Sequence, residues 1–177
     1  MCVICVKPAG AEMPANDILR LMAKRNSDGY GFVSSKGKNC KTMNLEIFLR
    51  ELARVSKEES CIVHMRWATH GSVSQKNCHP FYDKDTKFWF AHNGVLPIAS
   101  KNDMTDSEIA FRETIVPAIK KHGVQSHIFD NIVNNLRGSS RFALLKGDSV
   151  YIMGDYSELD GCYYSNLNWL PRYWQQC

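Results

Sequence analysis

The chain has 177 residues, a length that favours one domain and leaves little room for two. Its hydrophobic fraction of 44% and charged fraction of 23% are those of an ordinary globular protein with a sizeable core. The net charge of +4 is not gathered into a dense basic run, which argues against a nucleic-acid partner. No apolar run is long enough to span a membrane and the N-terminus does not form a signal peptide, so we expect neither a membrane partner nor export. The seven cysteines show no regular spacing, which favours reduced thiols in a cytoplasm.

Hydrophobic periodicity predicts strands at both ends of the chain and helices between them. Apolar and β-branched runs between turn residues predict strands at 2–6, 29–33, a short segment after 36–38, 61–67, 87–92, 142–145 and 150–153. Apolar residues at helical spacing predict helices around 18–22, 47–55, 109–115 and 128–136. This grouping favours an α+β fold with antiparallel sheets, in which helices cover the outer faces of two sheets. The sequence contains no linker or internal repeat, so we expect a single domain over residues 1–177.

Capping residues give more exact expectations for four helix ends. Asn16 or Asp17 is expected to cap the first helix, and Asn44 the second. Residues 105–108 have the form of a capping box for the third helix. Pro117 is expected to bend or end that helix, because proline lacks a backbone N–H.

Cys2 is the first candidate for chemistry. Removal of Met1 would place a free α-amine on the same residue as a thiol, so one residue could supply a nucleophile and a base. The plainer interpretation is a small core residue in an apolar strand. A redox or metal pair formed by Cys2 and Cys5 is disfavoured, because the two side chains would point to opposite faces of a strand.

Three further groups of polar residues follow predicted strands or begin a helix. The segment 64–71 offers Arg66, whose planar guanidinium can hold a carboxylate by two hydrogen bonds. Asn93 and Gly94 can form a pair of donors suited to an oxyanion. Asp106 could accept a hydrogen bond from a substrate ammonium, and it also suits the first turn of a helix.

Taken together and in this order, the motifs resemble the class II glutamine amidotransferase domain, most closely that of the glucosamine-phosphate synthases. The matching motifs are the N-terminal Cys, Arg-x-x-Asp-x-x-Gly (25–31), Arg-Trp-Ala-Thr-His-Gly (66–71), His-Pro (79–80), His-Asn-Gly (92–94) and Thr-Asp-x-Glu (105–108). The resemblance implies the four-layer αββα sandwich of N-terminal-nucleophile hydrolases. It also implies an enzyme that releases ammonia from L-glutamine through a glutamyl thioester, without a metal or other cofactor.

The resemblance also implies a role for each matching residue. Cys2 would attack the side-chain amide, and Asn93 and Gly94 would bind the oxyanion. Arg66 would hold the α-carboxylate of glutamine and Asp106 its α-ammonium. The residues expected to line or support the pocket are Trp67, Thr69, His70 and, as a supporting residue, Arg25.

Three features depart from the pattern: the residue after the nucleophile, the Met1 that must first be removed, and the end of the chain. Val3 stands where family members commonly have glycine. Because the chain ends at Cys177, we expect any ammonia-accepting synthase to be a separate subunit. Its docking surface could include the aromatic residues near the C-terminus, although these could equally fill the edge of the core: Tyr163, Tyr164, Trp169, Tyr173 and Trp174.

Two other functions remain open. The first is hydrolysis of a different γ-glutamyl amide, since Arg66 and Asp106 would recognise any free glutamyl α-end. The second is a non-catalytic binding module on the same scaffold.

Overall fold

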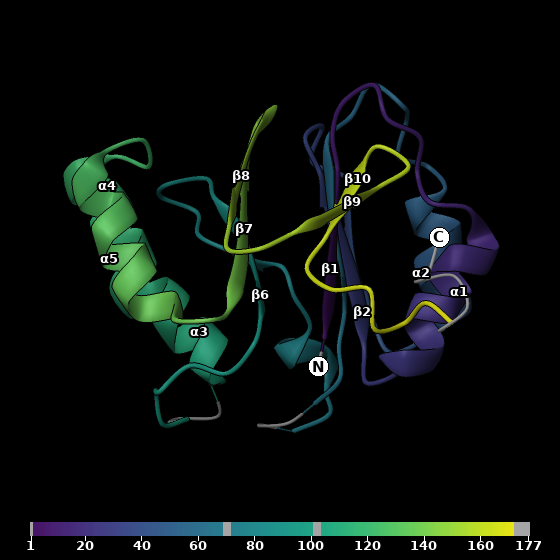
Figure 1. Cartoon of the computed structure of the whole chain (residues 1–177), viewed down its shortest axis with the longest axis horizontal. Coiled ribbons are helices and arrows are strands. Elements are labelled where there is room, and N and C mark those ends of the chain that lie inside the picture. The colour runs from purple at the N-terminus through teal and green to yellow at the C-terminus, as the bar shows by residue number, and fades with distance from the viewer. Residues whose placement is uncertain (1, 69–71, 101–103, 172–177) are drawn as a thin grey trace.

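Two antiparallel sheets lie at the centre of the computed structural model, which describes residues 2–68, 72–100 and 104–171 (Figure 1). One sheet has six strands in the order β3-β2-β4-β1-β10-β9, and the other has four in the order β5-β6-β7-β8. The strands of the larger sheet are β1 (Val3–Lys7), β2 (Tyr30–Ser34), β3 (Asn39–Thr42), β4 (Cys61–Met65), β9 (Ser157–Leu159) and β10 (Cys162–Tyr164). Those of the smaller sheet are β5 (Phe81–Tyr82), β6 (Trp89–Asn93), β7 (Arg141–Lys146) and β8 (Ser149–Met153).

Helices cover the outer face of each sheet, which gives four layers (Figure 1). The larger sheet is covered by α1 (Asn16–Arg25) and α2 (Leu45–Leu52). The smaller sheet is covered by α3 (Asp106–Ala110), a π-helical turn (Phe111–Ile115), α4 (Val116–His122) and α5 (His127–Arg137). The expected α+β sandwich is therefore confirmed. Among the described residues, no helix is long and apolar enough to cross a membrane.

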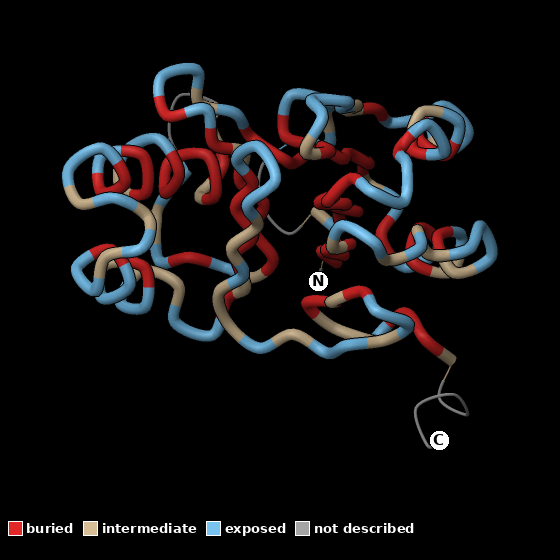
Figure 2. Tube along the Cα trace, turned by 90° about the horizontal axis from the view of Figure 1, so that it is seen from above, coloured by how far each residue is buried: buried red, intermediate tan, exposed pale blue. Residues whose placement is uncertain are grey.

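Successive side chains of a strand point to opposite faces of its sheet, and this alternation divides the hydrophobic core into three clusters. In β1, Val3 and Cys5 pack with α1 and α2, whereas Ile4 and Val6 pack between the sheets. The third cluster lies between the smaller sheet and its helices and is rich in phenylalanine. Figure 2 shows the buried segments in the strands and on the inner sides of the helices, with exposed residues on the outside. The two faces of β1 thus contribute side chains to different layers of the core.

Two of the predicted helix caps are confirmed and one is wrong. The Asn44 side chain accepts hydrogen bonds from the N–H groups of Glu46 and Ile47, and Thr105 accepts one from Glu108. The first helix, however, begins after Ala15 and has no side-chain cap. Asp17 lies inside its first turn and accepts a hydrogen bond from the N–H of Ile18.

Pro117 is expected from the sequence to bend or end the helix, and the chain remains helical beyond it, so the end is not observed. Pro117 lies in the first turn of α4, directly after the π-helical turn, and α4 continues to His122. A proline has no N–H to donate within a helix, so a change in the hydrogen-bond pattern just before it accommodates the ring.

Two of the aromatic residues near the C-terminus, Tyr164 and Trp169, fill the core. Tyr164 and Trp169 are 2% and 3% exposed, and their ring centroids lie 5.2 Å apart. Tyr163 is half-buried beside the layer between the sheets, and Tyr173 and Trp174 lie outside the described residues. Of the two interpretations, core filling therefore holds for Tyr164 and Trp169.

Truncation of Phe48 should test the helix-covered side of the larger sheet. Phe48 is fully buried against the rings of Tyr30 and Phe32. We expect Phe48→Ala to lower the free energy of unfolding by about 3–5 kcal/mol, because a cavity replaces the ring. The control is Ile47→Ala on the same helix, where the side chain is 39% exposed and the loss should be much smaller. Equal losses in urea denaturation would contradict this packing.

Candidate functional site

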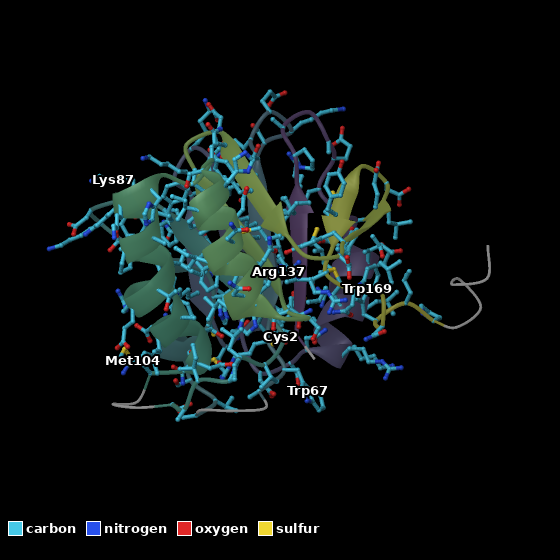
Figure 3. The ribbon with its side chains drawn as sticks, turned by 60° about the vertical axis from the view of Figure 1, so that its left-hand side comes forward. Cys2, Trp67, Lys87, Met104, Arg137 and Trp169 are labelled. Carbon is cyan, nitrogen blue, oxygen red and sulfur yellow. The ribbon has the colours of Figure 1, made fainter. Side chains whose placement is uncertain are left out.

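The strand β1, which begins directly after Cys2, directs the Cys2 thiol toward the second sheet. Cys2 precedes β1, and Ile4, two residues on, packs between the sheets. Residues two apart lie on the same face of a strand, so Cys2 shares this face. Figure 3 shows Cys2 and Trp67 at the same end of the sandwich, with Trp67 further to the outside.

The thiol of Cys2 is held by the backbone of Trp67. Its sulfur lies 3.3 Å from the Trp67 nitrogen, which donates to it, and 3.4 Å from the Trp67 carbonyl oxygen. Burial raises the pKa of the Cys2 thiol, while the Trp67 hydrogen bond and the Arg66 guanidinium counteract part of this rise. Any cation or base near Cys2 would therefore favour the reactive thiolate.

A cleft beside Cys2 brings together most of the residues expected from the sequence. Its enclosed space of about 30 Å³ is room for roughly one water molecule, so a ligand such as an amino acid would also fill the open mouth. Five expected site residues line this cleft: Cys2, Arg66, Trp67, Gly94 and Asp106. The lining also includes residues that the sequence analysis did not assign to the pocket: Ala68, His79, His92, Thr105 and Ser107.

Arg66 lies buried at the end of β4, where the polypeptide leaves the sheet. Its Nη1 donates to the carbonyl oxygen of Ser72 at 2.9 Å, and its backbone bonds to Gly29 and Asp28. The Asp28 carboxylate in turn accepts the N–H of Ala68 at 2.8 Å. Asp28 therefore holds the segment 66–68 in place, a function the sequence analysis missed although Asp28 lies in the 25–31 motif.

Asn93 and Gly94 follow one another at the end of β6. The Asn93 side chain is buried, and its Nδ2 donates to Ser165 Oγ at 2.8 Å. Gly94 has a φ of +147°, and a side chain there would collide with Ser140. Glycine is therefore required for the chain to turn here and to leave the backbone of residue 94 open to the cleft.

Asp106 lies in the first turn of α3, close to the loop that follows Gly94. One carboxylate oxygen accepts the N–H of Leu96 at 3.0 Å, and the other accepts the N–H of Ser107 at 2.7 Å. Oδ1 also accepts the hydroxyl of Ser107 at 3.2 Å. These bonds fix the carboxylate at the wall of the cleft, and Oδ2, with Leu96 as its donor, keeps a second lone pair.

Three buried histidines stand next to the cleft. The rings of His64 and His79 lie 4.2 Å apart, and His64 Nε2 lies 3.0 Å from the carbonyl oxygen of His92. Burial lowers the pKa of His64 to about 3 and that of His92 to about 4, and it places the pKa of His79 well below its usual value. All three rings are therefore neutral near pH 7, and they add no charge beside Arg66.

The other expected residues lie elsewhere. Thr69 and His70 fall outside the described residues. Arg25 is exposed and lines a second, more open cavity of about 210 Å³ together with Asn26, Asn166 and Trp67. Trp67 is therefore shared by the two cavities, whereas Arg25 lines only the second of them.

Known proteins are similar in sequence to this chain over most of its length. The family described as class-II glutamine amidotransferases matches residues 33–159. Glutamine–fructose-6-phosphate aminotransferase from Staphylococcus epidermidis is 30% identical over 149 residues, which cover 76% of this chain and 24% of that enzyme. The Escherichia coli K12 protein YafJ is 26% identical over 175 residues, which cover 83% of this chain and 64% of YafJ. The chain thus spans about a quarter of the aminotransferase that it matches.

Solved structures show the same fold at low identity. Glutamine phosphoribosylpyrophosphate amidotransferase from B. subtilis, complexed with ADP and GMP, has a TM-score of 0.60 and 18% identity. The match covers 93% of this chain and 41% of that one. A structure of the allosteric regulatory enzyme of purine biosynthesis has a TM-score of 0.61 at the same identity. The αββα sandwich is therefore that of the N-terminal-nucleophile hydrolases.

The buried histidines predict a loss of stability in mild acid. An unfolded histidine binds a proton below a pKa of about 6.5. The folded rings of His64 and His92 resist protonation down to about pH 3 and 4. Between these values the unfolded chain binds more protons, so the free energy of unfolding should fall as the pH drops below about 6.5. Glu59, whose pKa is lowered to about 2, should contribute only at still lower pH.

Urea midpoints measured from pH 7 to pH 4.5 would test this expectation. The fall should be shallower in His64→Gln and unchanged in His127→Gln, because His127 is exposed. A fall of the same steepness in all three proteins would show that His64 does not cause it.

Proposed function

Because this chain belongs to the class II glutamine amidotransferases, we propose that it hydrolyses L-glutamine to glutamate and ammonia with Cys2 as the nucleophile. The observation that carries the proposal is the cleft in which Cys2 meets Arg66, Gly94 and Asp106. These groups could serve as a nucleophile, an anion site, an oxyanion donor and a cation site around one small ligand.

The proposed reaction begins with removal of Met1, which would give Cys2 a free α-amine. That amine would take the thiol proton as the sulfur attacks the side-chain carbonyl carbon of glutamine. The developing oxyanion would lie against the N–H of Gly94 and the amide of Asn93. Collapse of this intermediate would expel ammonia, which takes up the proton, and leave a glutamyl thioester. Water would then release glutamate and restore the thiol.

Recognition of the substrate would rest on its zwitterionic α-end. The buried guanidinium of Arg66 is suited to the α-carboxylate, since a planar fork can make two parallel hydrogen bonds. The Asp106 carboxylate, fixed by Leu96 and Ser107, is suited to the α-ammonium. Trp67, which is 47% exposed, would cover the mouth of the cleft, and Thr69 and His70 stay proposed pocket residues.

The use made of the ammonia is also a proposal. The Staphylococcus epidermidis relative is named as an aminotransferase for fructose 6-phosphate, and this chain matches about a quarter of it. We expect the ammonia to reach an acceptor-binding synthase, on a separate subunit or in another part of a longer protein.

Substitution of Cys2 is the direct test of the nucleophile. We expect Cys2→Ala to abolish glutamine hydrolysis, because neither the thioester nor another acyl-enzyme can form. The matched control is Cys40→Ala, which removes a partly exposed thiol from the edge strand β3 and should retain full activity. Ammonia and glutamate would be measured together with the intact mass, which reports whether Met1 is present. Full turnover by Cys2→Ala would refute the mechanism.

Substitution of Asp106 tests recognition of the α-ammonium. We expect Asp106→Asn to lower kcat/KM for glutamine by about tenfold or more, mainly through KM, because it removes a charge that binds ground and transition states alike. A substrate that lacks the α-amine, glutaric acid monoamide, provides the control. The wild type should use it poorly, and Asp106→Asn should reduce its turnover little further. A similar reduction for both substrates would assign Asp106 to another task.

A further inference from the structure

Ser165 connects the strand of Cys2 to the side chain of Asn93. It follows the last residue of β10, in the sheet of β1, and is 2% exposed. Its Oγ accepts the N–H of Ile4 at 2.8 Å and the Nδ2 of Asn93, from the opposite sheet, also at 2.8 Å. Its backbone N–H donates to the carbonyl oxygen of Ile4 at 2.9 Å. Ser165 therefore bonds to both backbone groups of Ile4 in β1, and its hydroxyl also bonds to Asn93 of the second sheet.

The next residue fixes the nucleophile end of the same strand. Asn166 Nδ2 donates to the carbonyl oxygen of Cys2 at 2.8 Å. The Asn166 carbonyl oxygen accepts the indole N–H of the buried Trp169 at 2.9 Å. Residues 165 and 166 are therefore anchored to the core. Through their hydrogen bonds they fix the position of Cys2 relative to Asn93.

The hydrogen-bond capacity of Asn93 shows what the serine contributes. A carboxamide nitrogen carries two hydrogens, and Ser165 takes one of them. Within the part of the chain that the structure describes, the oxygen of the same amide is buried with no hydrogen-bond partner. Among the described residues, Ser165 is thus the hydrogen-bond partner that fixes the amide plane. The second hydrogen of Nδ2 is the one that the proposed mechanism would give to the substrate.

We infer that Ser165 is a positioning residue for the oxyanion site: its hydroxyl orients the Asn93 amide toward the carbonyl attacked by Cys2. The inference rests on the proposed function, and it adds a residue outside the matched segment 33–159. Ser165 itself does not touch the substrate. Its effect should therefore appear in the rate of the chemical step and not in the binding of glutamine.

Ser165→Ala is the central experiment, carried out on the whole chain. We expect kcat to fall by about tenfold to a hundredfold, less than the roughly 10²–10³-fold loss typical of removing an oxyanion donor, with KM nearly unchanged. Ser165→Thr keeps a hydroxyl and should restore most of kcat. The matched control is Ser60→Ala, because Ser60 is also buried and its Oγ accepts the N–H of Ala9 beyond the other end of β1. This control should leave kcat unchanged.

Two readouts separate positioning of the amide from damage to the strand. Alkylation of Cys2 by iodoacetamide, mapped by peptide mass spectrometry, reports the thiol and needs no oxyanion site. Its rate should be the same in Ser165→Ala and the wild type. In an Asn93→Ala background, Ser165→Ala should cause little further loss of kcat, because the residue through which it acts is absent.

The outcomes are distinct. An unchanged kcat in Ser165→Ala, an equal fall in alkylation and kcat, or full additivity with Asn93→Ala would each overturn the inference. If the wild-type protein showed no turnover that depends on Cys2, the proposed function would be refuted instead. The Cys2→Ala assay decides this before any Ser165 variant is compared.

Discussion

The register of β1 is the constraint on which the site depends. β1 is a central strand, paired on one side with β4 and on the other with β10. A shift by one residue would turn Cys2 toward the helices and Val3 toward the second sheet, because neighbouring side chains point to opposite faces. Both ends of the strand resist such a shift. Lys7 is fully buried and donates to the carbonyl oxygens of Pro8, Lys57 and Glu59, while Ile4 is bonded through both its backbone groups to Ser165.

Val3 illustrates how this register accepts a larger residue than the glycine common in the family. Its side chain is fully buried in the cluster beneath α1 and α2, facing away from the cleft. The face that carries Cys2 is therefore unaffected by the size of residue 3. Packing on one side of the strand and chemistry on the other can vary independently.

Local sequence patterns predicted most helices and strands, but they could not predict contacts between residues far apart in the sequence. The runs at 61–67, 142–145 and 150–153 and the Asn44 cap each depend on neighbours in sequence, and the structure contains all four features. The strands β5 and β9 have two and three residues, too few to show a period. Ser165 contacts Asn93 across 72 positions and Ile4 across 161, so no spacing along the chain could reveal its role. The resemblance to the family supplied Asn93 and Asp106, but not the residues that hold them.

The layer between the sheets changes character from one end to the other. Away from the cleft it is apolar, with Val6, Ile62 and Leu145. At the cleft it contains His64 and Asn93, whose polar groups bond to residues of the opposite layer, His92 and Ser165. Buried polar groups cost free energy unless they are paired, and His64 Nδ1 and Asn93 Oδ1 have no partner among the described residues. This end therefore stabilises the fold less than an apolar end would.

The burial of these polar groups strengthens the proposed chemistry. Donors in a poorly solvated site act more strongly on a developing charge than donors in water, and fixed donors need no reorientation during the reaction. Neutral histidines preserve this condition, because a cationic ring beside Arg66 would compete with it for the substrate carboxylate. The depressed histidine pKa values and the buried Ser165–Asn93 bond are then two parts of one arrangement. Some folding free energy is lost, and among the described residues that line the cleft the formal charges are those of Arg66 and Asp106.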